Sequence, residues 1–297
     1  MPRGSTNPFS TAAFLWLLRA LWIGLAVTVT AAISNAGEDI GGIAGMVAPA
    51  VWFLALAVVA VDLVLVSPLG LTIVRGLTPA TVPAALLAYA HDDGVTALLA
   101  ALLGVAATVV ALTGEVGEAM AQGSAYGDER RFPLRAPATM LPPLIGSWVA
   151  WCALLLGAVV AVGHERWAIA VPLAVLAAAA TWLVGRAAHR LSRRWLVLVP
   201  AGLVVHDHVV LGETLMVQRT NIRSAALALA DTDAADLTGP AGGHAIDVTV
   251  KDMVLAVFPA TKAQPKGRAI HVQSFLVAPS RPGRALRAMA DARLPVG

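Results

Sequence analysis

Apolar residues are grouped in two different ways along this chain. Up to about Arg186, long apolar stretches recur with few charges between them, whereas beyond it the apolar runs are short and charges are frequent. Runs near the roughly 20 residues that cross a hydrocarbon core predict transmembrane helices. Short runs that alternate with polar residues predict half-buried strands. The pattern therefore predicts an α-helical polytopic membrane bundle followed by a β-rich domain.

Six stretches are candidate membrane spans, and the third is the least certain in length. The segment Leu77–Ala90 contains Pro79 and Pro83, and as a helix of about 14 residues it would cover only ~21 Å. We expect it to borrow flanking residues, to thin the bilayer locally or to be re-entrant. The candidate spans are 11–33, 43–73, 77–90, 95–112, 144–162 and 167–184.

The distribution of basic residues decides how many stretches cross. With six spans and a cytoplasmic N-terminus, the dense basic segment Arg186–Arg194 lies in the cytoplasm and only Arg166 lies in the outer connections. With five spans that segment would lie outside, against the positive-inside rule. We therefore predict a multi-pass protein of the inner (plasma) membrane with both termini cytoplasmic. Residues 1–190 form the predicted transmembrane domain, and residues 191–297 the cytoplasmic domain.

Seven short strands and one helix are predicted in the second part. A turn at residues 200–202 separates the first two strands, because proline and glycine favour turns. Ser280, followed by Pro282, begins the final helix, which extends to about Arg293. The predicted strands are Trp195–Val199, Leu203–Val210, Glu213–Arg219, Ile222–Leu229, Ala245–Val250, Met253–Phe258 and Ala269–Val277.

The strand order resembles that of the bacterial pleckstrin-homology-like domains that follow transmembrane helices. The resemblance rests on residues 194–199 (Arg-Trp-Leu-Val-Leu-Val), the strand Leu203–Val210 and residues 213–223, which end in Asn-Ile-Arg. It covers about a third of the chain and implies a nearly closed barrel, capped by the helix, that binds proteins or lipid head groups. The acidic insert Asp231–Ala245 departs from a compact version of that fold. The helical part resembles actinobacterial integral membrane proteins, which implies no activity.

Composition agrees with a membrane protein and limits its chemistry. Hydrophobic residues make up 58% of the chain and charged residues 13%, against about 25% charged in an ordinary soluble domain. The net charge of +3 is too small and dispersed to indicate a nucleic-acid partner. The single cysteine, Cys152, cannot form a disulfide within one chain. No phosphate-binding, dinucleotide, zinc-protease or nucleophile-elbow motif is present, so we predict neither an enzyme nor a cofactor.

Two charged residues, Arg19 and Asp62, interrupt the first two spans. Both fall in the cytoplasmic halves of adjacent antiparallel helices, which indicates an intramembrane charge pair. A charge in lipid is costly unless it is paired or hydrated, so such groups usually face the interior or a cavity. One hypothesis is a pair that lines a conduction pathway. The other is a packing pair, or an Arg19 that extends its charge to the nearby interface.

Two basic segments are candidate contacts with a partner or with lipid. The connection Thr113–Pro143 exceeds normal loop length, and its most distinctive run, residues 126–132, contains Arg130 and Arg131. That run is either a partner-binding segment or a salt-bridged interfacial turn. A second basic loop could contact anionic lipid, although a plain hairpin is the alternative. Its basic residues are Lys262, Lys266 and Arg268.

Histidines and aspartates in the tail do not predict a metal site. His206 and His208 lie on one face of a predicted strand, but a usual zinc site needs three or four ligands. Asp231, Asp233 and Asp236 resemble a calcium loop only in spacing. That loop lacks glycine at its sixth position and glutamate at its twelfth.

These observations favour a non-enzymatic membrane scaffold or accessory subunit. Its helices would lie in the lipid bilayer, and its cytoplasmic domain would dock a membrane or cytoplasmic protein. The alternative is a small-solute or ion transporter, or a channel component, with Arg19 and Asp62 in its pathway. A cavity that reaches this pair from the cytoplasm would favour transport, whereas a closed, alanine-packed bundle would favour the scaffold.

Overall fold

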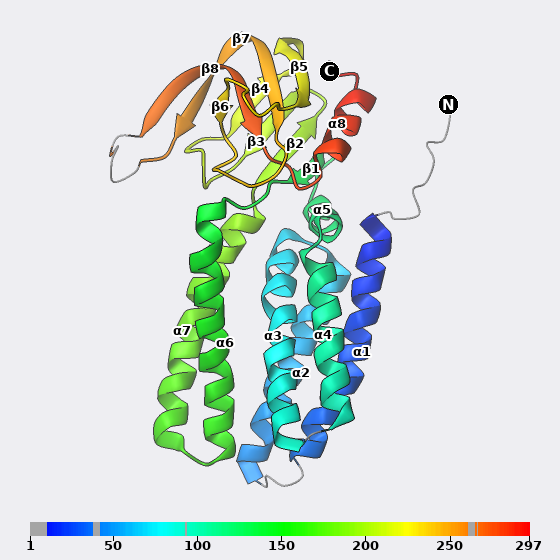
Figure 1. The fold of residues 1–297 in the computed structure, drawn as a ribbon, viewed down its shortest axis with the longest axis vertical. Coiled ribbons are helices and arrows are strands. Elements are labelled where there is room, and N and C mark those ends of the chain that lie inside the picture. The colour runs from blue at the N-terminus through cyan, green and yellow to red at the C-terminus, as the bar shows by residue number, and fades with distance from the viewer. Residues whose placement is uncertain (1–10, 38–41, 93, 261–264, 266) are drawn as a thin grey trace. The chain divides into compact units, whose positions relative to one another are not determined.

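A computed structural model describes residues 11–37, 42–92, 94–260, 265 and 267–297 of the chain (Figure 1). These residues form two compact units, each of which is described by itself. The helical unit comprises Met1–Met120 and Leu144–Ala188, and the β unit comprises Ala121–Pro143 and His189–Gly297. The β unit therefore draws on two separate parts of the sequence. Its first part belongs to residues 1–190, which were expected to be transmembrane.

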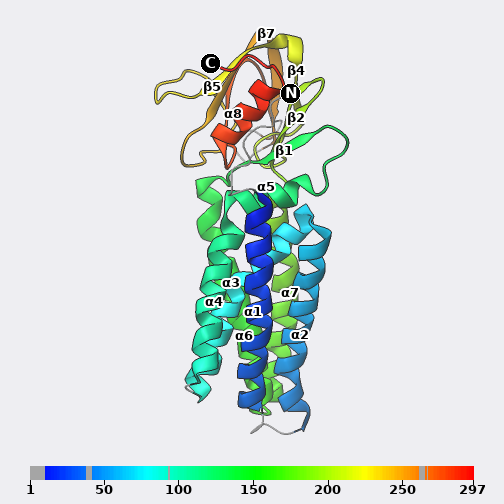
Figure 2. The same ribbon diagram turned by 90° about the vertical axis from the view of Figure 1, so that its right-hand side faces the viewer.

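Among the described residues, six helices are long and apolar enough to cross a membrane, as the sequence predicts. They run side by side in Figure 2. Helix α5 (Gly114–Gln122) is shorter and more polar. The six long helices are α1 (Thr11–Gly37), α2 (Gly42–Leu65), α3 (Pro68–Asp92), α4 (Val95–Leu112), α6 (Leu141–Gly163) and α7 (Trp167–Ser192).

The third helix is longer than its apolar pattern predicts. Helix α2 ends at Leu65, and α3 begins at Pro68, so residues 68–73 belong to the third helix and not to the second. Val66 has a positive φ of 43°, and proline is favoured in the first helical turn because it has no N–H to pair. Pro79 and Pro83 lie inside α3. The apolar part of α3 is thereby 23 residues long, which removes the need for a re-entrant segment.

Small residues permit close helix packing at Gly104 but not at two other glycines of the helical unit, Gly157 and Gly185. A Cβ atom added to Gly104 would lie 2.6 Å from Thr81 Oγ1, so this glycine permits the approach of α3 and α4. A Cβ on Gly157 would make an ordinary contact with Leu173, and one on Gly185 would meet nothing within 4 Å. Helix α4 also packs against α1. The buried core of these helices includes Leu18, Leu25, Val59, Leu71 and Ala107.

The first sheet of the β unit has four antiparallel strands in the order β1-β2-β3-β4. Strand β1 pairs with β2, with Phe132 opposite Leu196. It comes from the connection that precedes α6, and its four residues bury only Phe132, which is too short a pattern to predict a strand. The strands are β1 (Arg130–Pro133), β2 (Trp195–Val199), β3 (Gly202–His206) and β4 (Leu215–Gln218).

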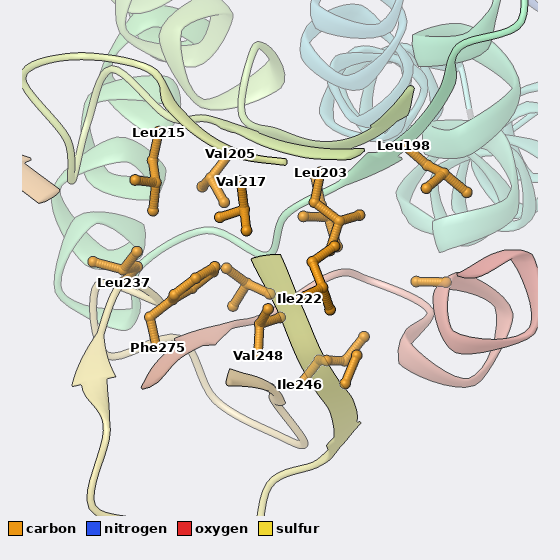
Figure 3. Packing of buried hydrophobic residues seen from close by; sticks show 14 of the residues in the cluster. Leu198, Leu203, Val205, Leu215, Val217, Ile222, Leu237, Ile246, Val248 and Phe275 are labelled. Atoms are coloured by element: carbon orange, nitrogen blue, oxygen red, sulfur yellow. The ribbon is translucent and has the colours of Figure 1, made fainter. Parts of the chain in front are cut away.

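The second sheet has the order β5-β7-β8-β6, in which β6 and β8 are parallel. Strand β7 joins two predicted strands, and a shift in its pairing with β8 between Thr249 and Val254 marks their junction. Figure 3 shows Leu203 and Val217 of the first sheet facing Val248 and Phe275 of the second. Short 3-10 turns lie at Ala138–Met140 and Arg219–Asn221. The remaining elements are β5 (Ile222–Leu227), β6 (Ala235–Asp236), β7 (Ile246–Phe258), β8 (Arg268–Val277) and α8 (Pro282–Asp291).

The final helix contributes to the same core, as its pattern predicts. Met289 of α8 is fully buried, and Leu286 packs against the core at partial exposure. The expected architecture of a β-rich domain that ends in a helix is therefore confirmed. The expected identity with pleckstrin-homology-like domains stays a prediction.

Candidate functional site

Arg19 binds the end of a neighbouring helix. Its Nε and Nη2 donate to the carbonyl oxygen of Leu63 at 3.2 Å and 2.7 Å, and its guanidinium lies 4.5 Å from the ring centre of Trp16. Leu63 is in the last turn of α2, where main-chain carbonyls lack donors from the same helix. A cation at a helix C-terminus is also favoured by the helix dipole. Arg19 therefore caps α2.

Asp62, the expected partner of Arg19, points elsewhere. Its side chain is buried and faces Gly70 of α3, where an added Cβ would lie 3.1 Å from Asp62 Cβ and 3.3 Å from Oδ1. Within the described residues no ion pair joins Asp62 to Arg19. Successive helical residues project about 100° apart, so a guanidinium at the Leu63 carbonyl need not face the preceding side chain. A contact between side chain and main chain thus replaces the expected charge pair.

Arg75 repeats this arrangement at a second helix, which no local sequence pattern predicted. Its Nε donates to the carbonyl of Ala111 at 3.0 Å, and its Nη2 donates to the carbonyl of Thr113 at 3.1 Å. Both carbonyls are at the C-terminal end of α4. Two arginines in the helical unit therefore supply donors to helix ends.

The helical unit contains an apolar cavity of about 430 Å³ that the sequence analysis missed. Residues of α1, α2, α3 and α6 line it, and the lining includes neither Arg19 nor Asp62. No aspartate, glutamate, lysine or arginine is among the lining residues, and their only titratable side chains are Cys152 and His164. The volume is within the roughly 300–1,000 Å³ that is usual for small-molecule sites.

Three tryptophans are among the residues that line the cavity, and the indole N–H of each donates a hydrogen bond elsewhere. Their indole N–H groups donate to threonine hydroxyls, and the rings of Trp22 and Trp52 are stacked with their centres 6.2 Å apart. Polar tips that are satisfied in this way leave apolar ring surface toward the cavity. The three bonds are Trp22 to Thr78 (3.2 Å), Trp52 to Thr30 (3.0 Å) and Trp151 to Thr181 (2.7 Å).

The β unit contains a buried ion pair between Arg194 and Asp207. Two hydrogen bonds of 2.8 Å and 2.7 Å join them, and neither side chain is exposed. Arg194 also donates to the carbonyls of Arg135 (2.6 Å) and Thr238 (3.2 Å). Arg194 is the last residue of the predicted basic segment, but its side chain is buried. Its partner lies thirteen residues away, on the adjacent strand's end, so it could not be seen as a local pattern.

His206 and His208 lie together at the end of β3. Their rings are 4.3 Å apart, and His206 also stacks on Trp195. Burial lowers the pKa of His206, and the nearby His208, Arg193 and Arg131 lower it further. In the part of the chain that the structure describes, no three or more His, Cys, Asp or Glu side chains gather as metal ligands would. The two rings therefore form a packed aromatic contact, in which the lowered pKa of His206 favours its neutral form.

Arg130 and Arg131 are the first two residues of β1 and follow the turn at Gly127 and Asp128. Arg131 forms an ion pair with Glu129 and lies 4.6 Å from the ring centre of Trp195. Arg130 lies 3.9 Å from Asp291 at an exposed position. The ion pair is compatible with the salt-bridged turn, whereas its place at the membrane interface and contact with a partner both stay predictions. Burial lowers the pKa of the nearby Arg135, whose side chain donates to the carbonyl of His244.

The predicted basic loop is only partly described. Lys262 and Lys266 lie outside the described residues, and Arg268 is exposed at the first position of β8. Asp231, Asp233 and Asp236 are partly or fully exposed, and the Oδ1 of Asp236 accepts the N–H of Thr238 at 2.7 Å. Contact of the basic loop with lipid therefore stays a prediction.

Comparisons with known proteins found no matching family model, no matching curated protein and no matching solved structure.

Proposed function

We propose that this protein is a non-enzymatic membrane scaffold or accessory subunit whose β unit docks a protein partner. The observation that carries the proposal is how two arginines of the helical unit, Arg19 and Arg75, use their side chains. Arg19 and Arg75 are each bound to a helix C-terminus, which is a structural use of charge. A solute pathway through the pair Arg19 and Asp62 has less support, because the cavity is lined by neither residue.

The outer halves of β7 and β8 are the part of the β unit best suited to docking. They extend as a two-stranded ribbon beyond the rest of the unit (Figure 1). Met253 and Leu255 alternate along β7 and therefore lie on one face, with 60% and 49% of their surfaces exposed. Exposed apolar side chains that gather on a regular face often mark a protein-interaction site. The partner's surface should accordingly be apolar at its centre.

Affinity purification of the full chain from native membranes tests this function. We expect a protein to be retained in stoichiometric amount and to be lost from the double variant Met253→Glu with Leu255→Glu. Leu229→Glu is the control, because Leu229 is 82% exposed but lies outside the ribbon. Equal retention by both variants would remove the ribbon from the proposal. Solute flux through vesicles that contain only this protein would favour the transporter instead.

A further inference from the structure

We propose that the apolar cavity of the helical unit holds one acyl chain of a bilayer phospholipid. This inference goes beyond docking by the β unit and does not depend on it. It rests on the chemistry of the wall, the length of the lined surface and the position of its polar end.

The wall can bind hydrocarbon but offers little to a polar solute. The indole N–H groups of Trp22, Trp52 and Trp151 are bound to threonines, and the Thr81 hydroxyl donates to the carbonyl of Thr78 at 2.7 Å. Away from His164, a polar ligand that left water for this wall would lose hydrogen bonds that the apolar lining does not replace. A hydrocarbon chain loses none and gains contact with aromatic and aliphatic surface.

The lined surface is about as long as a lipid leaflet is thick. Along α6 the lining residues run from Trp151 to His164, which corresponds to about 20 Å at the rise of an α-helix. The hydrocarbon core of a bilayer is about 30 Å thick, so the chains of one leaflet occupy about 15 Å. One extended acyl chain therefore matches the length of this surface.

The cavity lies toward the end of the helices at which the wall becomes polar. Most of the lining residues of α1, α3 and α6 come from their C-terminal halves and most of those of α2 from its N-terminal half, whereas Trp22 and Trp151 lie near the middle of α1 and α6. This is the end that carries the α6–α7 connection, where His164 lines the cavity and Arg166 is exposed. A phospholipid is built in the same way, because its acyl chain is apolar and its head group at one end is polar. On the orientation expected from the sequence, the chain would enter from the outer leaflet.

A chain held in this cavity differs from lipid that merely surrounds the protein. Four helices supply the wall, and Trp22, Trp52 and Trp151 are buried even though the cavity is empty of protein atoms. A chain held between these helices should dissociate more slowly than lipid against exposed side chains such as Leu54 or Leu102. It should therefore stay bound when the full chain is extracted in mild detergent.

Native mass spectrometry of the extracted full chain tests the proposal. We expect a phospholipid bound one-to-one to the wild type and to Ala153→Phe, whose site on α6 is exposed and outside the cavity. In Ala84→Phe, a ring from the cavity wall should occupy the space of the chain. The bound fraction should fall at least about tenfold, since that factor corresponds to the burial of only about two methylenes.

A second variant and a second measurement guard against misfolding of Ala84→Phe. Cys152→Phe fills the same cavity from α6 and should also lose the lipid. Palmitoyl-oleoyl phosphatidylglycerol added to delipidated protein should raise the melting temperature of the wild type and Ala153→Phe but not of the filled variants. Equal lipid retention or equal stabilisation in all four proteins would overturn the proposal. So would a wild type that carries a free fatty acid, a second copy of the chain or no lipid.

Discussion

Arg194 and Asp207 lie opposite each other one position beyond the paired ends of β2 and β3. Trp195 pairs with His206 in the antiparallel register. Arg194 precedes Trp195 and Asp207 follows His206, so the register brings these two residues together. The resulting ion pair has two hydrogen bonds and no exposed side-chain surface. Asp207 also accepts the N–H groups of Val209 and Val210. A single pair thus holds two strand ends and the turn that follows them.

Removal of one partner from this pair should be strongly destabilising. Asp207→Asn keeps the size of the side chain but leaves the Arg194 charge buried and unpaired, which should cost about 3–5 kcal/mol of unfolding free energy. Denaturant unfolding of the full chain, followed by the fluorescence of its tryptophans, measures the cost. Asp291→Asn breaks the exposed pair with Arg130 and should cost at most about 1 kcal/mol. Similar costs for both variants would contradict the burial of the Arg194 pair.

Arg19 and Asp62 should behave as nearly independent residues. Arg19→Met removes the donor to the Leu63 carbonyl, and Asp62→Asn alters a side chain that faces Gly70. The coupling energy from a double-mutant cycle should therefore be no more than about 0.5 kcal/mol. Thermal melts of both single variants and the double variant in detergent would measure it. A coupling of several kcal/mol would restore the ion pair that the sequence predicts.

Gly104 and Gly185 should respond in opposite directions to alanine. Within a helix, alanine is favoured over glycine by about 1 kcal/mol, so Gly185→Ala should be neutral or stabilising. Gly104→Ala would place its Cβ 2.6 Å from Thr81 Oγ1 and should destabilise the helical unit by about 1–3 kcal/mol. Melting temperatures in the same detergent compare the two. A stabilised Gly104→Ala variant would show that α3 and α4 do not meet closely here.

The stability of the β unit should decrease as the pH falls below about 6.5. The pKa of His206 is lowered from 6.5 in the folded protein, mainly by burial, so the unfolded chain binds the proton more readily. The contribution of His206 to the free energy of unfolding is therefore fully present above the pKa that His206 has in the unfolded chain. It is lost as the pH falls through the lower pKa that His206 has in the folded protein. His206→Gln should flatten the dependence of melting temperature on pH, whereas His271→Gln, at an exposed position of β8, should not. An unchanged dependence in His206→Gln would assign the effect to other groups.

Both ends of the chain should lie in the cytoplasm. Six spans and the positive-inside rule place the residues after α7 on that side. A fluorescent protein fused after Gly297 should therefore be bright, and alkaline phosphatase fused there should be inactive. Phosphatase inserted after Glu165 is the matched control and should be active. The reverse pattern would invert the membrane orientation used here.

The sequence by itself determined the kind of each element and its approximate place. Span-length apolar runs and alternating short runs are local properties, so they revealed six helices, a β-rich tail and a final helix. One helix boundary was predicted wrongly. The boundary between α2 and α3 was missed because an apolar run does not show where a backbone turns, although Pro68 marks the point.

Only the tertiary structure decided which distant residues meet. Phe132 joins the β core through a four-residue strand, and Arg194 is buried because a strand register brings Asp207 opposite it. Arg19 donates to the main-chain carbonyl of Leu63 and not to the Asp62 carboxylate, because α2 ends beside Arg19. The cavity forms where four helices fail to fill the space between them. Each of these outcomes depends on contacts between segments far apart in the chain, and local patterns carry no information about such contacts.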